Sequence, residues 1–260
     1  MRMAKNISVL IPLILLCTSI QCQAFANSLV ETIKKVKPSI VGVGKYNPTS
    51  SPRAQILGTG FAILNGSYIA TNHHVIPETL SEQQQEKLVV FTGHGNDSTV
   101  VDAFVVAVDP EHDLAILRIH TKALKPLTLE SSQKFKPDGT EIAFTGFPIG
   151  SVLGLYPVTH KGIISALTPT ATPAANSQQL NLARLKRLRN PFLTYQLDAT
   201  AYPGNSGSPV YLADSGTVIA VINKVFVKQS KENVLSDPSA ITYAIPVTHL
   251  TALTKLINRK

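Results

Sequence analysis

The sequence contains no tryptophan, only two cysteines and few charged residues. Charged side chains make up 15% of the 260 residues and hydrophobic ones 44%, a balance that excludes an intrinsically disordered chain. The net charge is +8, but the cations are spread along the chain instead of forming an arginine run with interleaved aromatics, which excludes a dedicated nucleic-acid-binding protein. No HExxH motif accompanies the adjacent His73 and His74, so we expect neither a metal site nor a cofactor.

Both cysteines, Cys17 and Cys22, lie at the N-terminus in or just after an apolar run. This run, Ile7–Ile20, follows a positively charged start and precedes an Ala-x-Ala pattern at residues 24–26, as in a secretory signal peptide. The run is shorter than the roughly 20 residues that a transmembrane helix needs. We therefore predict a signal peptide over residues 1–26 and an exported protein, periplasmic or secreted. An uncleaved anchor and lipid attachment at either cysteine are the weaker alternatives.

Short apolar runs, rich in β-branched residues and broken by turn residues, occupy most of the remaining chain. They are Ser39–Gly44, Gly58–Leu64, Ser67–Ala70, Lys87–Thr92, Val100–Val108, Leu114–Ile119, Glu141–Gly146, Gly162–Leu167, Thr194–Leu197, Pro209–Leu212 and Val218–Lys224. Strands at such close spacing predict an all-β barrel or sandwich instead of βαβ units. We expect a short helix over residues 28–36, a closing helix over Val247–Ile257, and an inserted loop with a basic helix over Pro169–Pro191.

The most informative string is Tyr-Pro-Gly-Asn-Ser-Gly-Ser-Pro at residues 202–209. A serine between small residues on a tight turn has an exposed hydroxyl, and the neighbouring backbone N–H groups can converge on one oxyanion. Ser206 is the candidate nucleophile. The predicted oxyanion hole comprises residues Gly204, Asn205 and Ser206, with the N–H groups of Gly204 and Ser206 as the donors. Taken alone, the string is equally compatible with a simple Gly/Ser turn.

A serine nucleophile needs a general base, and the base needs a carboxylate that orients it. An apolar strand that ends in His73 and His74 offers two candidate bases. Asp113 opens the apolar run that follows, where an acid is costly unless it is paired. We interpret Asp109 and Glu111 as solvated turn residues. The five remaining histidines are interpreted as surface or loop residues: His94, His112, His120, His160 and His249.

These strings occur in the order TNHHV, DLAIL, GNSGSP, with GTGFAI before them, GFPIG between them and YAIPVTHL after them. In this respect the sequence resembles the trypsin/chymotrypsin-like serine proteases, and most closely the protease domain of the HtrA/Deg family. The resemblance runs from Leu29 to the C-terminus. It implies two six-stranded antiparallel β-barrels, a catalytic triad of His74, Asp113 and Ser206, and cleavage of proteins or peptides. The corresponding domains are a first barrel at about 38–125, a second at about 126–246 and the helix 247–257.

The sequence departs from the HtrA pattern at several positions. Ser208 replaces a glycine, which costs little provided that its φ is negative. Asn205 cannot form the ion pair that activates trypsin-like zymogens, so no proteolytic activation is expected. The chain stops soon after the closing helix, and we expect no PDZ domain. A homo-oligomer, for example a trimer, is an expectation from the resemblance.

Substrate preference and regulation are predicted from two further segments. Thr200, at the expected base of the S1 pocket, carries no charge, and the wall is expected from Val221, Ile222 and Asn223. Such a pocket favours small or medium aliphatic P1 residues. The inserted loop carries four cations that could contact an anionic surface, although a solvated helix is the simpler interpretation: Arg184, Lys186, Arg187 and Arg189. The alternative to a protease is a catalytically silent or chaperone-like peptide-binding module on the same fold.

Overall fold

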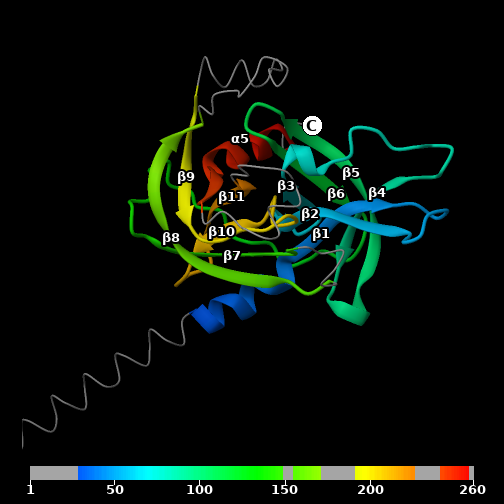
Figure 1. The fold of residues 1–260 in the computed structure, drawn as a ribbon, viewed down its shortest axis with the longest axis horizontal. Helices are drawn as coiled ribbons and strands as arrows, with labels where there is room; N and C mark the ends of the chain where they lie inside the picture. The colour runs from blue at the N-terminus through cyan, green and yellow to red at the C-terminus, as the bar shows by residue number, and fades with distance from the viewer. Residues whose placement is uncertain (1–28, 149–154, 171–190, 226–240, 258–260) are drawn as a thin grey trace, which may run out of the picture.

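The computed structural model describes residues 29–148, 155–170, 191–225 and 241–257, which form two closed six-stranded antiparallel barrels (Figure 1). The strand order is β1-β2-β3-β6-β5-β4 in the first barrel and β10-β11-β12-β9-β8-β7 in the second. The predicted all-β fold of two six-stranded barrels is therefore confirmed. The predicted signal peptide and the basic segment 171–190 lie outside the described residues.

The strands of each barrel follow one another along the chain. The first barrel comprises β1 (Ile40–Tyr46), β2 (Ala54–Ile63), β3 (Tyr68–Thr71), β4 (Lys87–Thr92), β5 (Thr99–Asp109) and β6 (Leu114–Ile119). The second comprises β7 (Glu141–Gly146), β8 (Val158–Pro169), β9 (Leu193–Asp198), β10 (Pro209–Leu212), β11 (Val218–Val225) and β12 (Ile241–Pro246). Three short 3-10 turns are η1 (Lys37–Ser39), η2 (His73–Val75) and η3 (Gly95–Asp97). A helix over residues 29–36 precedes the barrels and α5 (Val247–Ile257) follows them.

One hydrophobic cluster joins the two barrels. It combines Ile40 and Phe61 from the first barrel with Tyr211 and Val221 from the second, and Leu250 from α5. All five side chains are at most 1% exposed, and full burial of a large apolar side chain contributes about 1.5–3 kcal/mol. Because this core is shared, the facing surfaces of the two barrels are held in one relative position.

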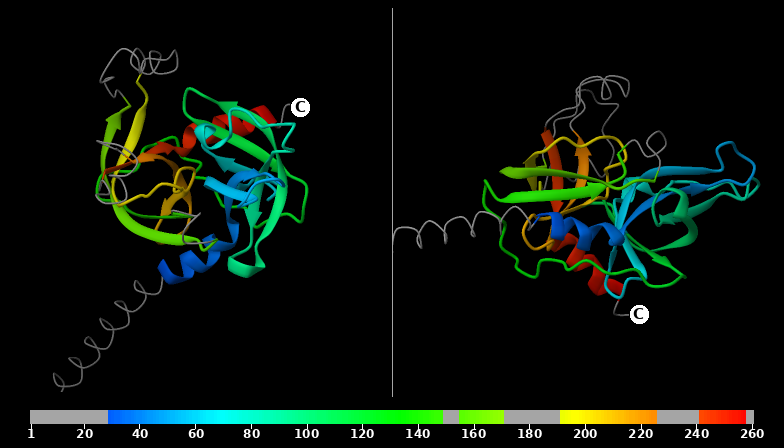
Figure 2. Two further views of the ribbon diagram at one scale, coloured as in Figure 1. Left: turned by 45° about the vertical axis from the view of Figure 1, so that its right-hand side comes forward. Right: turned by 90° about the horizontal axis from the view of Figure 1, so that it is seen from below.

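Helix α5 lies across both barrels (Figures 1 and 2). It contacts β5 and β6 of the first barrel and β11 and β12 of the second. Leu250 and Leu253 of this helix are buried, whereas Leu256 is exposed. The helix therefore packs on both barrels through one face, and it contacts the first barrel at β5 and β6. No helix among the described residues is long and apolar enough to span a membrane.

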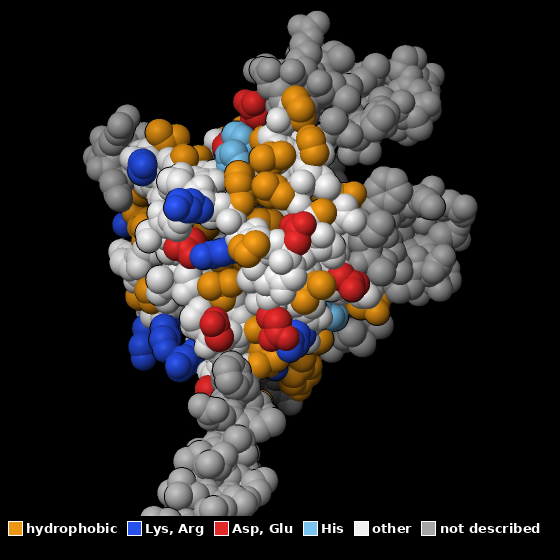
Figure 3. All heavy atoms as spheres, turned by 90° about the vertical axis from the view of Figure 1, so that its left-hand side faces the viewer, with side chains coloured by type: hydrophobic (Ala, Val, Ile, Leu, Met, Phe, Trp, Pro, Cys, Tyr) orange, Lys and Arg blue, Asp and Glu red, His pale blue; other side chains and the backbone are white. Residues whose placement is uncertain are grey.

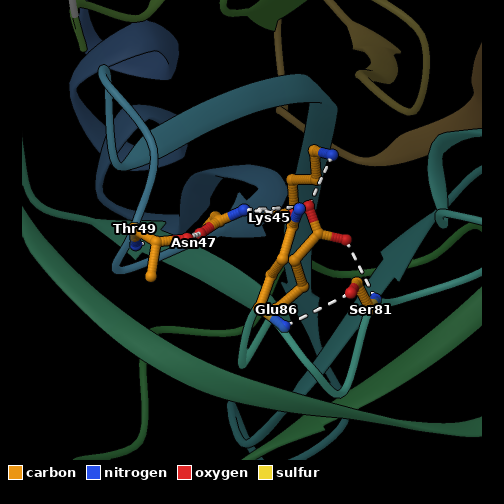
Figure 4. Close-up of polar contacts among 6 residues, drawn as sticks. Lys45, Asn47, Thr49, Ser81 and Glu86 are labelled. Carbon is orange, nitrogen blue, oxygen red and sulfur yellow. Dashed lines mark hydrogen bonds and ion pairs between the residues drawn. The ribbon is translucent and has the colours of Figure 1, made fainter.

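A polar network fixes the β1–β2 hairpin against the chain that enters β4 (Figure 4). The Glu86 carboxylate accepts hydrogen bonds from the backbone N–H of Ser81 at 3.0 Å, from Lys45 Nζ at 2.9 Å and from Asn47 Nδ2 at 3.3 Å. These bonds, that of Ser81 foremost, hold the pKa of Glu86 below its usual value. The network lies apart from the candidate site and stabilises the first barrel. On the opposite side of the molecule, Figure 3 shows cationic, anionic and apolar side chains interspersed over the second barrel.

Candidate active site

The two adjacent histidines occupy η2, the 3-10 turn directly after β3. Val75 anchors this turn because its side chain is buried in the core of the first barrel. Val75 fits there only because Gly58 has no side chain: a Cβ at residue 58 would lie 2.6 Å from Val75 Cγ2 and 3.0 Å from the carbonyl oxygen of Ser206. Gly58 thus lets the histidine turn and the loop that carries Ser206 approach each other.

His74 is the histidine that pairs with Asp113. Its Nδ1 lies 2.7 Å from Asp113 Oδ2, and its backbone N–H donates to Asp113 Oδ1 at 2.9 Å. Because a carboxylate can only accept, Nδ1 carries the proton and Nε2 of the neutral imidazole is left as an acceptor. The side chain of Asp113 is 7% exposed and that of His74 is 38% exposed. The pair therefore combines a buried carboxylate with an accessible base.

Asp113 adopts an unusual backbone conformation, with a φ of 54°. A non-glycine residue in this left-handed region costs about 1 kcal/mol or more, so neighbouring contacts must hold it there. Its carbonyl oxygen accepts hydrogen bonds from Asn72 Nδ2 at 3.0 Å and from the backbone N–H of His73 at 3.1 Å. The turn before β6 and the histidine turn are thereby bonded to each other through both the backbone and the side chain of Asp113.

Thr59 of β2 binds the Ser206 loop to the first barrel. Its backbone N–H donates to the carbonyl of Ser206 at 2.8 Å, and its hydroxyl donates to the carbonyl of Gly204 at 2.7 Å. The same hydroxyl accepts the backbone N–H of Phe147 at 3.0 Å. Gly207, at a φ of 86°, is required at this point because a Cβ there would lie 2.0 Å from the carbonyl oxygen of Thr59.

The hydroxyl of Ser206 donates to the backbone carbonyl of Asn223 at 3.0 Å. A hydroxyl has one proton to donate, so donation to His74 would require Ser206 to give up this bond. Catalytic hydrogen bonds are often formed only with substrate present, so this geometry is compatible with an active serine. Asn223 is 9% exposed, and its carbonyl is placed beside the nucleophile.

The three residues predicted to form the oxyanion hole differ in their contacts. The backbone N–H of Asn205 donates to the carbonyl of Tyr202 at 3.0 Å, and Gly204 adopts a φ of 97°. This leaves the N–H groups of Gly204 and Ser206 as the donor candidates. The Asn205 side chain is fully buried. Ser208 is not among the residues of positive φ, so the backbone at this position does not require glycine.

The four residues proposed for the S1 pocket are not gathered at one surface. Val221 and Ile222 are at most 1% exposed, and their side chains belong to two different hydrophobic clusters. Successive side chains of a strand point to opposite faces, which explains this separation. The expectation that both apolar side chains form the pocket wall therefore needs correction. Thr200 is half-buried and Asn223 lies at the serine.

Three histidines that we interpreted as surface or loop residues have specific contacts. The interpretation is wrong for His160 in β8 and His249 in α5, whereas His112 does lie in a loop, the turn between β5 and β6. His160 lies in β8 and stacks on Phe144, with ring centroids 4.8 Å apart, and burial lowers its pKa. His112 and His249 stack on each other with centroids 3.8 Å apart. Sequence analysis missed these contacts because ring stacking between distant segments leaves no local pattern. No group of three or more metal-ligating residues occurs among the described residues.

Comparison with known proteins identifies the family. The model of the trypsin-like peptidase domain matches residues 58–221. The chain belongs to this family. The matched region contains His74, Asp113 and Ser206, and the resemblance predicted from the sequence is confirmed.

Individual serine endoproteases are also similar to this chain in sequence. A probable periplasmic serine endoprotease, DegP-like, of Pseudomonas putida is 30% identical over 196 residues, which cover 75% of this chain and 35% of that protein. Its counterpart from Halomonas elongata is 32% identical over 197 residues, 76% of this chain and 34% of that protein. The chain thus spans about a third of the length of these relatives.

Solved structures share the fold. The serine endoprotease from Yersinia pestis has a TM-score of 0.61 and 23% identity, and the match covers 90% of this chain and 67% of that one. The active form of the Rv3671c protease from M. tuberculosis has a TM-score of 0.63 and 19% identity, with 88% of this chain and 84% of that one covered. At these identities the likeness concerns the two-barrel architecture alone.

Proposed function

We propose that this protein is a serine endopeptidase that hydrolyses proteins through an acyl-enzyme formed on Ser206. The observation that carries the proposal is the His74–Asp113 pair, which leaves Nε2 of an accessible imidazole as a proton acceptor. The membership of the chain in the trypsin-like peptidase family and its DegP-like relatives support the same activity.

In the proposed mechanism, the Ser206 hydroxyl exchanges its bond with Asn223 for one to His74 Nε2. As Ser206 Oγ attacks the peptide carbonyl, its proton passes to His74, and Asp113 stabilises the resulting imidazolium. The N–H groups of Gly204 and Ser206 bind the oxyanion of the tetrahedral intermediate. His74 then protonates the leaving amine, and water, deprotonated by His74, releases the acyl group.

The proposed substrates are unfolded or damaged exported proteins, cleaved after small or medium aliphatic residues. Uncharged Thr200 supports this preference because it offers no partner for a lysine or arginine at P1. With Val221 and Ile222 withdrawn into the core, Thr200 and Asn223 are the residues that we retain for the pocket. Mapping of cleavage sites on an unfolded protein tests this, and cleavage mainly after lysine, arginine or acidic residues would exclude it.

We also propose export through residues 1–26, in keeping with relatives that are named periplasmic. A homo-oligomer stays a prediction. An anionic contact also stays a prediction, because its four cations lie outside the described part of the chain: Arg184, Lys186, Arg187 and Arg189. Changing the four cations to glutamine and assaying peptide cleavage with and without anionic vesicles tests the second of them. If wild type and variant respond identically to the vesicles, the segment is a solvated loop without this contact.

The decisive experiment is covalent labelling with a fluorophosphonate. Wild type is expected to be labelled on Ser206 and to cleave casein, whereas Ser206→Ala is expected to lose both properties. Ser208→Ala is the matched control, because it removes a hydroxyl two residues away in the same loop. If wild type binds peptides but is neither labelled nor active, the protein is instead a silent binding module, which the Ser206–Asn223 bond would then explain.

A further inference from the structure

A second histidine–carboxylate pair lies next to Asp113 in the sequence. His112 Nδ1 is 2.7 Å from Asp109 Oδ2, and the backbone N–H of His112 donates to Asp109 Oδ1 at 3.1 Å. These two hydrogen bonds to the carboxylate of Asp109 close the turn between β5 and β6. Asp113, with its left-handed φ of 54°, is the next residue after the closed turn.

The His112 ring attaches this turn to other elements. It stacks on His249 of α5, with centroids 3.8 Å apart and the planes at 22°. Phe192, just before β9, meets both rings in a T-shaped arrangement, with centroid distances of 4.7 Å to His112 and 5.2 Å to His249. Aromatic pairs of this kind contribute about 0.5–1.5 kcal/mol beyond the area that they bury. Three segments from distant parts of the sequence thus meet at His112.

The cluster has the position and the rigidity to control Asp113. The hydrogen bonds from Asn72 and His73 fix the carbonyl of Asp113, which lies on the C-terminal side of this residue. The side chains of His112 and Asp109 are only 22% and 25% exposed, so this side of the turn is held by packing as well as by hydrogen bonds. A strained φ persists only where the surrounding structure over-determines it.

We propose that His112 is a positioning residue, and that its bonds to Asp109 and its stack on His249 and Phe192 hold the β5–β6 turn so that Asp113 faces His74. The inference rests on the proposed role of Asp113 in the reaction. The cluster touches neither substrate nor the reacting serine. It acts through the orientation of the carboxylate, on which the tautomer and position of His74 depend.

Two readouts test this role, one of which does not require activity. In the inactive Ser206→Ala background, NMR detects the Nδ1 proton of His74 in its short hydrogen bond, assigned by its disappearance in His74→Ala. His112→Ala is expected to broaden this resonance or move it upfield. In the active enzyme, the same substitution is expected to lower kcat by about 10-fold or more, since small misplacements of catalytic groups have large effects, with KM changed less than about twofold.

Matched variants separate positioning from general stability. His249→Phe keeps a ring under His112 and is expected to retain kcat within about twofold. His120→Ala removes an exposed histidine that contacts Phe104 at 5.5 Å in the same barrel, and it is expected to leave both readouts unchanged. If His112→Ala does not fold, His112→Phe and His249→Ala remove the Asp109 bond and the stack separately, and each is expected to shift the resonance.

The outcomes are distinguishable. An unchanged Nδ1 resonance and unchanged kcat in folded His112→Ala would overturn the positioning role while leaving the proposed protease intact. Wild type that neither hydrolyses peptides nor reacts with a fluorophosphonate would refute the proposed function, and the NMR comparison would still show whether the cluster orients Asp113.

Discussion

His74 with Asp113 and His112 with Asp109 are joined in the same way. In each pair the Nδ1 atom lies 2.7 Å from one carboxylate oxygen. The other oxygen accepts the backbone N–H of the same histidine, at 2.9 and 3.1 Å respectively. In both pairs the carboxylate therefore fixes the tautomer of the imidazole and leaves Nε2 as an acceptor.

The two pairs differ in their surroundings. His74 is on an accessible turn that Gly58 allows to approach the Ser206 loop. The ring of His112 stacks on His249 of α5 and meets Phe192 in an edge-to-face contact. The geometry of a histidine–carboxylate pair therefore does not define an active site. What defines it is whether the remaining nitrogen of the imidazole can reach a nucleophile and a substrate.

The largest difference is expected when each carboxylate is replaced by its amide. Asp113→Asn is expected to lower kcat by about 10⁴-fold, because the amide stabilises the wrong tautomer of the base and no imidazolium. Asp109→Asn changes the same atoms in the second pair and is expected to cost only about 10-fold, through the position of the turn. Measurement of kcat and KM on one peptide substrate compares them. Equal losses would show that the two pairs are not functionally distinct.

Sequence analysis could predict the first pair but not the second. His74, Asp113 and Ser206 lie in short strings whose residue types have a chemical reason, and the structure pairs the first two directly. His112 and Asp109 also lie close together in the sequence, yet nothing local shows that His249 and Phe192 cover them. That contact depends on where α5 crosses the first barrel, which is a property of the tertiary fold.

Thr59→Val tests how the Ser206 loop is attached to the first barrel, which carries the His74–Asp113 pair. This substitution keeps the shape of the side chain but removes the hydrogen bonds to Gly204 and from Phe147. We expect a loss of stability of about 1–3 kcal/mol. We also expect a fall in kcat of about 10-fold, because the loop with the proposed oxyanion donors loses its bond at Gly204 and keeps only the backbone bond at Ser206.

Thr145→Val is the matched control for this substitution. Thr145 is also fully buried, and its hydroxyl bonds Thr159 and Tyr211 inside the second barrel. Urea unfolding is expected to show similar losses of stability for both variants, whereas only Thr59→Val is expected to lower kcat. A similar fall in kcat for both would mean that loop attachment is not the cause.

The strands illustrate why some of the fold could be predicted and some could not. The predicted bounds of β4, β6, β7 and β10 agree with the structure, because each is a compact apolar run with turn residues at both ends. β8 extends from Val158 to Pro169, beyond the predicted Gly162–Leu167, since only one of its twelve residues is buried. β12 (Ile241–Pro246) was not predicted, because its short run continues directly into α5 and offers no turn signal.

The smallest effect on catalysis, and a distinct effect on stability, is expected for His249→Phe. Burial, and then the neighbouring His112, lower the pKa of His249 to about 4, while Asp109 opposes this shift. The ordinary value of about 6.5 applies in the unfolded chain. Between these values the unfolded state binds a proton that the folded state does not, so His249 makes the protein less stable as the pH falls from about 6.5 towards 4.

Urea unfolding at pH 7 and pH 5 measures this contribution. Wild type is expected to lose about 2 kcal/mol more than His249→Phe over this interval, because phenylalanine keeps the stack but cannot bind a proton. Carboxylates such as Glu86, whose pKa is lowered, remain charged at pH 5 and do not contribute. His120→Phe, at an exposed site, should retain the wild-type dependence. If wild type and His249→Phe lose the same stability between pH 7 and pH 5, His249 binds a proton equally well in the folded and unfolded states, and the lowered pKa is wrong.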